Sequence, residues 1–326
     1  MTLAVGVDLG GTRLRAALVD PGAEVPALLV EERLEVGEDR TPARVADLLA
    51  TAVDRVTKNA PEPIAGVGVG IAAQLRGRTG VVANAPNFGW REVDFRALVR
   101  ARLGANVDLY NDLKAITWGE GRYGAGKGSQ YMLCVYVGTG IGSGICVDGR
   151  LDYGAGNLAG EIGHTKVTWG PDARPCGCGK RGCVEAYAGG KNLQARVQSE
   201  LAAGAKSKAL ELAGGDIKKV HPGHVDEAAR AGDPYARALW AEVAPLLGVA
   251  LANACTLLNP DRLVMGGGTW EGTPELRRLT MEVFWERINN AHKEWLSVVE
   301  TSLGGIAGML GAASLITGTG STPPSR

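Results

Sequence analysis

A repeated hairpin constrains the fold of this chain more than any other feature of its sequence. The fourteen residues VDLGGTRLRAALVD from Val7 align without a gap on VYVGTGIGSGICVD from Val135. Each copy reads as an apolar run, a turn rich in glycine and threonine, and a second apolar run, which is typical of two strands joined by a tight turn. The repeat indicates two related halves. Chance matching is the alternative, since the chain contains 48 glycines.

The length of the chain agrees with two halves. One hydrophobic core rarely serves 326 residues, so two lobes are expected. If each lobe opens with one copy of the hairpin, the two glycine turns would lie opposite each other across a cleft.

Charge and hydropathy argue against several classes of protein. Thirty-five basic residues balance thirty-five acidic ones, so there is no excess positive charge for sequence-independent binding of nucleic acid. The start, MTLAVGVDLGGT, lacks the pattern of a secretory signal, and no run of about 20 uninterrupted apolar residues predicts a membrane span. We expect a cytoplasmic protein with no nucleic-acid or membrane partner. Thiols stay reduced in that compartment, so disulfides are not expected.

Between and after the hairpins, the patterns alternate between strand and helix. TPARVADLLATAVDRV predicts a helix that begins at Thr41 and Pro42, and DFRALVRARL predicts another that is capped by Asp94. IAGVGVGI predicts a buried strand, and ANVDLYND predicts a strand that stops at Asn111. Residues 224–260 read as helical, with Pro245 expected to kink or divide the helix.

The glycine turns suggest phosphate binding. Turns without side chains let backbone N–H groups approach phosphate oxygens, and an acid just before such a turn can hold Mg²⁺. Three turns have this composition, and their residues are Asp8, Gly10, Gly11 and Thr12, then Gly138, Thr139 and Gly140, then Gly266, Gly267 and Gly268. One turn alone would be equally consistent with a plain hairpin. Three together favour a nucleotide site.

Asp112 has two interpretations that the local sequence does not separate. It follows a strand and opens a helix, so it could be the N-cap of that helix. It could also be a general base at a strand end, taking the proton from an alcohol that attacks phosphorus.

A cluster of cysteines predicts a metal site. Cys176, Cys178 and Cys183 follow His164 with the spacing His-x11-Cys-x-Cys-x4-Cys. Three thiolates and an imidazole form a good tetrahedral set for structural Zn²⁺, and four protein ligands leave no open position for catalysis. A redox pair is less favoured, because the Cys-x-x-Cys spacing is absent.

Taken together, the motifs resemble those of the ROK sugar kinases (repressors, open reading frames, kinases), and the bacterial glucokinases among them. The resemblance runs from Val5 to about Ala313 and rests on DLGGT, APNFGW, YNDLKA, VGTGIGSGI, GEIGH, CGCGKRGCVE, VMGGG and LGGIAGMLGAA. GEIGH and CGCGKRGCVE are the most specific of these. Lys114, after the proposed base, and Pro245 depart from the familiar pattern.

The resemblance implies an α/β, actin-like ATPase fold with two ribonuclease H-like lobes and an active-site cleft between them. It implies a small lobe of residues 1–112, on which a C-terminal helix of about 304–317 packs back, and a larger lobe of 113–303 with a zinc-binding loop, 164–185. Asp112 would be the catalytic base. The other sugar hydroxyls would be bound by Asn87, Asn111, Glu161, His164 and Glu185.

The expected activity is ATP-dependent phosphorylation of a hexose, most simply glucose at its 6-hydroxyl, with Mg²⁺ and a structural Zn²⁺. The first two glycine turns would handle phosphates and Mg²⁺, and the third would approach the adenosine. There are three alternatives. The phosphoryl donor could be polyphosphate, the acceptor could be N-acetylmannosamine, N-acetylglucosamine, mannose or fructose, or the protein could be a sugar-responsive repressor. The repressors of this family carry a DNA-binding segment ahead of the kinase-like part, and because Asp8 comes so early in this sequence we do not expect one here. A homodimer or homotetramer is implied by resemblance alone.

Overall fold

Both predicted hairpins are present, at matching positions of the repeat. In the computed structural model, which describes residues 2–23, 26 and 28–318, the first hairpin consists of β1 (Ala4–Leu9) and β2 (Arg13–Val19). The second consists of β9 (Tyr131–Val137) and β10 (Ile141–Val147). The alignment of the two sequence segments therefore carries over to strands and turns, and the repeat is structural.

The repeat extends to whole sheets. Five strands form the first sheet in the order β3-β2-β1-β4-β8, with β3 at Leu28–Glu35, β4 at Val67–Ile71 and β8 at Val107–Asn111. Five strands form the second in the order β11-β10-β9-β12-β13, with β11 at Arg150–Asp152, β12 at Arg262–Gly266 and β13 at Ser297–Glu300. In each sheet, the strand that follows the hairpin in sequence lies on one side of it, and two later strands lie on the other side.

The chain divides into two compact units. The first contains Met1–Met132, Gly144–Ala159 and Thr301–Arg326, and the second contains Leu133–Ser143 and Gly160–Glu300. Helix α3 (Asp112–Tyr123) thus belongs to the first unit. The expected lobes, 1–112 and 113–303, have different bounds and stay a prediction.

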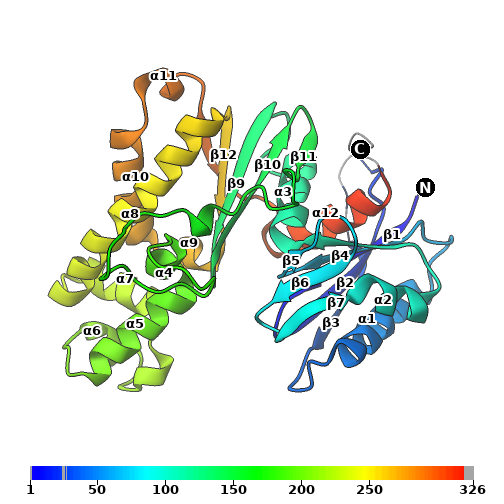
Figure 1. Ribbon diagram of the computed structural model, residues 1–326, viewed down its shortest axis with the longest axis horizontal. Helices are drawn as coiled ribbons and strands as arrows, with labels where there is room; N and C mark the ends of the chain where they lie inside the picture. Colours follow the sequence, from blue (N-terminus) through cyan, green and yellow to red (C-terminus); the bar gives the residue numbers. More distant parts are fainter. Residues whose placement is uncertain (1, 24–25, 27, 319–326) are drawn as a thin grey trace. The chain divides into compact units, whose positions relative to one another are not determined.

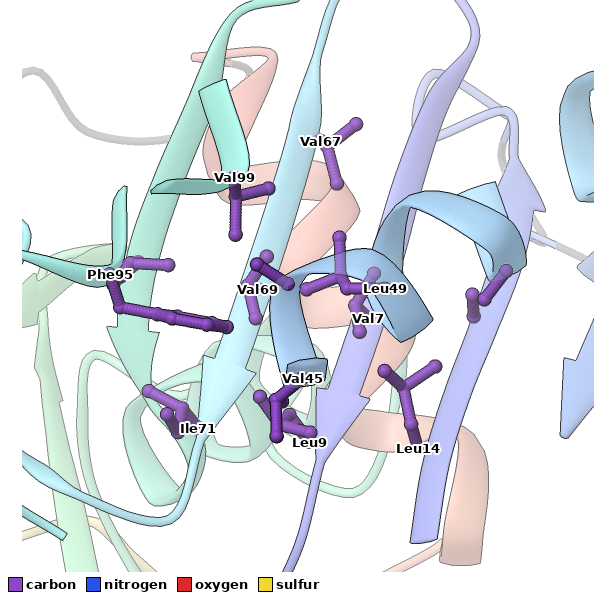
Figure 2. Packing of buried hydrophobic residues seen from close by; sticks show 14 of the residues in the cluster. Val7, Leu9, Leu14, Val45, Leu49, Val67, Val69, Ile71, Phe95 and Val99 are labelled. Carbon is purple, nitrogen blue, oxygen red and sulfur yellow. The ribbon is translucent and has the colours of Figure 1, made fainter. Parts of the chain in front are cut away.

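Helices cover both faces of the first sheet (Figure 1). Helices α1 (Pro42–Thr57) and α2 (Phe95–Leu103) pack on the face that carries Val5, Val7 and Leu9. Figure 2 shows Val45 and Leu49 of α1 against Val7 and Leu9. Side chains alternate along a strand, so the remaining residues of β1 face the other way.

Helix α12 (Ala307–Ile316) lies on that opposite face, in contact with β1, β4 and α3. A Cβ atom at Gly6 would come within 1.9 Å of the Met309 carbonyl oxygen, so only glycine allows α12 to lie this close to β1. Helix α12 is therefore part of the first unit.

A small antiparallel sheet accompanies the first unit, in the order β5-β6-β7. Its strands are Gln74–Leu75, Val81–Ala85 and Trp90–Asp94. The turn between β6 and β7 carries Asn87. Asp94 ends β7 and caps α2 as predicted, since its carboxylate accepts the Ala97 N–H.

The second unit is mostly helical after residue 184. Its α-helices are α4 (Glu185–Ala188), α5 (Gly190–Ala202), α6 (Lys208–Leu212), α7 (Pro222–Arg230), α8 (Pro234–Leu258), α9 (Gly268–Gly272), α10 (Pro274–Arg287) and α11 (Asn290–Lys293). Short 3₁₀ turns occur at Ile162–His164 and Ile217–Lys219, and Gly304–Ile306 forms one in the first unit.

Pro245 lies inside α8 and does not divide it. The helical region is divided instead at residues 231–233, between α7 and α8, and Asp233 is the N-cap of α8. By length and composition alone α8 could also cross a membrane, but it packs against α7 and α10 as a core helix does.

Candidate functional site

In the first unit, the proposed base and the first glycine turn lie at one edge of the sheet. β1, β4 and β8 are parallel, so their carboxyl ends meet at the same edge. Asp8 is near the end of β1, and Asp112 follows β8 directly. Gly70 of β4 pairs with Asp8, and its missing Cβ would lie 3.7 Å from the Asp112 Cα. Because position 70 is glycine, β4 places no side chain between Asp8 and Asp112 at this point of the sheet.

Asn111 is the N-cap of α3, and the interpretation of Asp112 as that cap is wrong. The Asn111 Oδ1 accepts the Lys114 N–H at 3.2 Å, while its Nδ2 donates to the Ala73 carbonyl and to Asp112 Oδ1, at 3.2 and 3.1 Å. Asp112 Oδ1 also accepts the Leu113 N–H at 2.9 Å. The Asp112 carboxylate is therefore held in orientation at the start of α3, which is what a general base needs.

Asn87 lies directly on the first glycine turn. A Cβ atom at Gly11 would come within 2.8 Å of the Asn87 Cβ, so the turn and the APNFGW loop touch because Gly11 has no side chain. Arg40 also contacts the loop, because its Nη1 donates to the Asn87 carbonyl at 2.8 Å. The Trp90 indole in turn donates to the Arg40 carbonyl at 2.6 Å.

Lys114, the departure from the familiar pattern, is 2% exposed, and its Nζ donates to the Asn157 carbonyl at 2.8 Å. Asn157 Nδ2 donates to the Gly77 carbonyl at 2.7 Å. The lysine thus links α3 to the loop after β11 without removing any residue of the proposed site.

In the second unit, the four predicted metal ligands come together. The ligand atoms of His164, Cys176, Cys178 and Cys183 all lie within 4.8 Å of one another. Cys178 Sγ and Cys183 Sγ are 3.7 Å apart, as are Cys176 Sγ and His164 Nδ1. Zn–S bonds of about 2.3 Å in a tetrahedron place sulfur atoms about 3.8 Å apart. The donor set and its spacing fit a structural zinc.

Two features around this cluster bear on its charge. Lys166 Nζ lies 2.8 Å from Cys183 Sγ and donates to it, which places a cation beside the thiols. Burial raises the pKa of the Cys176 thiol to about 12. That thiol is therefore protonated at neutral pH without a metal, and metal binding must release the proton.

Glu185 connects the cluster to the second glycine turn. One carboxylate oxygen, Oε1, lies 3.9 Å from Cys176 Sγ, and the other, Oε2, accepts the Ile141 N–H at 2.8 Å. A Cβ atom at Gly140 would lie 2.5 Å from Oε2. Glu161 lies on the other side of His164, with 3.8 Å between His164 Nε2 and Glu161 Oε2. Of the three predicted sugar-binding residues of this unit, His164 therefore belongs to the cluster, and Glu161 and Glu185 lie beside it.

The second and third glycine turns are also adjacent. Thr269 Oγ1 donates to the Gly138 carbonyl at 2.8 Å, and the Gly190 N–H donates to the same oxygen at 2.8 Å. Gly267 has φ of +103°, which L side chains rarely adopt, and its missing Cβ would lie 2.6 Å from the Val137 carbonyl oxygen. The turns Gly138–Gly140 and Gly266–Gly268 thus form one backbone-lined surface.

Sequence reasoning missed the side chains that support the site. Arg15 is paired with Asp8, Arg40 with the Asn87 loop, Lys166 with Cys183, and Thr269 with Gly138. Only Arg15 had a local signal, because it lies opposite Asp8 when the first hairpin is drawn in register.

Comparisons with known proteins match most of the chain. The ROK family model matches residues 4–319. A glucokinase of Streptomyces coelicolor is 33% identical over 97% of this chain and 98% of its own length. A xylose repressor of Caldicellulosiruptor bescii is 28% identical over 80% of this chain and 65% of its own length.

Solved structures agree. A ROK family glucokinase from Streptomyces griseus, in complex with glucose and AMPPNP, is 32% identical with a TM-score of 0.80, covering 96% of this chain and 98% of that one. A ROK hexokinase from Thermus thermophilus is 29% identical with a TM-score of 0.80, covering 96% and 97%. These relatives support a sugar kinase that uses ATP. The ROK kinases have the actin-like ATPase fold, with which the two repeated sheets of this chain agree. The chain therefore belongs to the ROK family.

Proposed function

We propose that this chain transfers the terminal phosphoryl group of ATP to the 6-hydroxyl of a hexose, and that glucose is its best acceptor. The observation that carries the proposal is the grouping in the first unit. An oriented carboxylate, Asp112, lies at the same sheet edge as the acid and glycine turn of Asp8–Thr12, and Asn87 touches that turn. The similarity to glucokinases supports the choice of acceptor.

Asp112 is the proposed base. As the sugar oxygen attacks the terminal phosphorus, its proton passes to the Asp112 carboxylate, a new O–P bond forms, and the bond from phosphorus to the bridging oxygen breaks to release ADP. Hydrogen bonds from Leu113 and Asn111 to Oδ1 keep the carboxylate in one orientation. This saves the cost of ordering the base during the reaction.

The glycine turns are proposed to bind the nucleotide. Backbone N–H groups of Asp8–Thr12 and Gly138–Gly140 would contact phosphates, and Gly266–Gly268 would approach the adenosine. Asp8 would hold Mg²⁺, a cation that favours carboxylate oxygen. Bound Mg²⁺ neutralises charge on the phosphates, and the chain's own part is to position them.

Sugar hydroxyls are proposed to bind Asn87 and Asn111 in the first unit and Glu161, His164 and Glu185 in the second. Zinc on His164 and the three cysteines would stabilise the loop without activating water, because four protein ligands leave no open position. It would also fix His164 by its Nδ1 and leave Nε2 on the side of Glu161.

Replacing the base tests the proposal. Asp112→Asn should lower kcat by at least about 100-fold with ATP and glucose, the usual range for loss of a general base. Glucose binding, measured by calorimetry, should be retained. The matched control is Asp94→Asn, which also changes an acid between a strand and a helix, and where asparagine caps equally well. Near-normal turnover by a folded Asp112→Asn protein would refute the assignment.

A panel of acceptors tests the choice of sugar. Comparing kcat/KM for glucose, mannose, fructose, N-acetylglucosamine and N-acetylmannosamine should rank glucose first. Another sugar at the top would leave the kinase assignment in place and change its substrate. Similarity to a xylose repressor makes a sugar-responsive regulator the second candidate. Absence of turnover with every sugar, together with salt-resistant binding to operator-like DNA, would favour it.

A further inference from the structure

The function proposed so far uses Asp8 but not Arg15, with which Asp8 forms an ion pair in the first hairpin. Asp8 of β1 and Arg15 of β2 are partners in the strand register, so their side chains leave the same face of the sheet. Arg15 Nη2 donates to Asp8 Oδ2 at 2.6 Å. The two side chains are 23% and 29% exposed. A short, charge-assisted and largely shielded contact of this kind holds both groups more firmly than an exposed pair does.

Two glycines, one just before α12 and one in its first turn, leave room for this pair. A Cβ atom at Gly305 would come within 2.9 Å of Arg15 Nη1, and one at Gly308 would lie 3.8 Å from the Asp8 Cβ. Both glycines belong to the motif LGGIAGMLGAA, which the nucleotide and sugar sites do not explain. The motif therefore has a physical link to the acid that precedes the first glycine turn.

The second hairpin does not carry an acid and an arginine at the equivalent positions. In the aligned repeat, Tyr136 takes the place of Asp8 and Ser143 takes the place of Arg15. The Ser143 hydroxyl donates to the Gly160 carbonyl at 2.7 Å. The acid–arginine pair is thus not needed to build a hairpin of this type, and of the two aligned hairpins it belongs to the one whose turn is proposed to hold the cation.

We infer that Arg15 is a positioning residue for Asp8 in phosphoryl transfer. The guanidinium engages Oδ2 and leaves Oδ1 for Mg²⁺ or one of its waters. Among the described residues, Asp8 accepts no other side-chain or backbone hydrogen bond outside the strand ladder. The planar guanidinium, which a lysine ammonium does not replace, sets the plane of the carboxylate. The inference rests on the proposed function, since that function assigns the cation to Asp8.

Divalent-cation binding tests Arg15 without relying on turnover. Mn²⁺ bound with AMPPNP is titrated by electron paramagnetic resonance, with no sugar present, for the wild type, Arg15→Gln, Arg15→Lys and Arg13→Gln. Arg13 is the matched control, because it lies on the same strand in an exposed pair with Glu35, its side chain 73% exposed. Loss of one charge-assisted contact should weaken Mn²⁺ binding by about tenfold in Arg15→Gln. Arg15→Lys should lose less Mn²⁺ affinity than Arg15→Gln, and Arg13→Gln should keep the wild-type affinity.

Steady-state kinetics give the second measurement. In Arg15→Gln the Mg²⁺ concentration for half-maximal turnover should rise by the same factor, while KM for the sugar stays within twofold. A purely structural role would change both together. If Arg15→Gln does not fold, Arg15→Lys carries the test. Wild-type Mn²⁺ affinity in a folded Arg15→Gln protein would overturn the inference. Arg15-dependent Mn²⁺ binding without phosphorylation of any sugar would overturn the proposed sugar kinase and leave standing the part of the inference in which Arg15 positions Asp8 for the cation.

Discussion

Adding a single methyl group at Gly140 should weaken sugar binding while leaving the fold intact. The Cβ of alanine would lie 2.5 Å from Glu185 Oε2, which is closer than real Cβ contacts allow. The obstructing atom is the end of a flexible side chain, so Glu185 moves and the backbone does not have to. Moving it breaks the 2.8 Å bond from the Ile141 N–H to Oε2.

The size of the effect on KM follows from the hydrogen bond that Glu185 is proposed to make to the sugar, which the displaced carboxylate no longer makes. A hydrogen bond to a charged group contributes about 1.5–3 kcal/mol, and 1.4 kcal/mol is a factor of about ten in a binding constant. If Glu185 binds the sugar from this position, KM for glucose should rise by about 10- to 100-fold. Ile141 is 6% exposed, so leaving its N–H unpaired should also lower the free energy of unfolding by about 1–3 kcal/mol.

The assay is a coupled measurement of ADP release at varied glucose and fixed, saturating ATP, with circular dichroism to confirm folding. The matched control is Gly272→Ala, where the added Cβ meets nothing within 4 Å. KM for glucose should rise in Gly140→Ala and stay at the wild-type value in Gly272→Ala. An unchanged KM in a folded Gly140→Ala protein would show that Glu185 does not bind sugar from the observed position.

Two further perturbations test the metal site and a helix cap. Cys178→Ser should reduce zinc, measured by elemental analysis, from about one per chain and raise KM for the sugar, whereas Cys255→Ser, outside the cluster, should do neither. Zinc loss with an unchanged KM would contradict the idea that the zinc site holds the sugar-binding residues in place. His221 Nδ1 accepts the Gly223 N–H at the start of α7, and burial, then the nearby His224, lowers the pKa of His221. Its neutral form therefore adds stability above about pH 6.5 that is lost as the pH falls. Between pH 7.5 and 5 the melting temperature should fall further for the wild type than for His221→Asn, and equal falls would refute the role.

Local patterns in the sequence were enough to predict the two hairpins. Strand, glycine turn and strand are set by residues within about fourteen positions of one another, and the repeated segment shows the same strands and turn at both places. The order β3-β2-β1-β4-β8 could not be predicted in this way. It depends on which distant strands pair, and that choice is made by packing of α1, α2 and α12 on the two faces.

Two local questions were left to the three-dimensional structure. Pro245 was expected to kink or divide a helix, and it does not divide α8, which continues through it and packs on α7 and α10. Asp112 and Asn111 are both good capping residues, and the sequence does not say which one caps. Asn111 does so because β8 ends at Asn111, and its side-chain oxygen accepts the Lys114 N–H in the first turn of α3.

The metal ligands were predictable for a different reason. Cys176, Cys178 and Cys183 lie so close in the chain that few conformations separate them, and only His164 had to be brought in from outside that loop. Arg15 illustrates the opposite case, because arginine on a strand is ordinary, and its role depends on what the opposite strand and the start of α12 place beside it.

The glycines of the two hairpin turns have a second physical role besides phosphate approach. Gly11 allows Asn87 to rest on the first turn, and Gly140 allows Glu185 to rest on the second. In each unit, a residue proposed to bind sugar therefore touches a turn proposed to bind phosphate, and neither contact survives an added Cβ. In the second unit the contact continues through Glu185 to Cys176. Glu185 accepts the Ile141 N–H beside the phosphate turn and also contacts Cys176, a proposed zinc ligand. Under these roles, loss of zinc would disturb the phosphate turn as well as the sugar site.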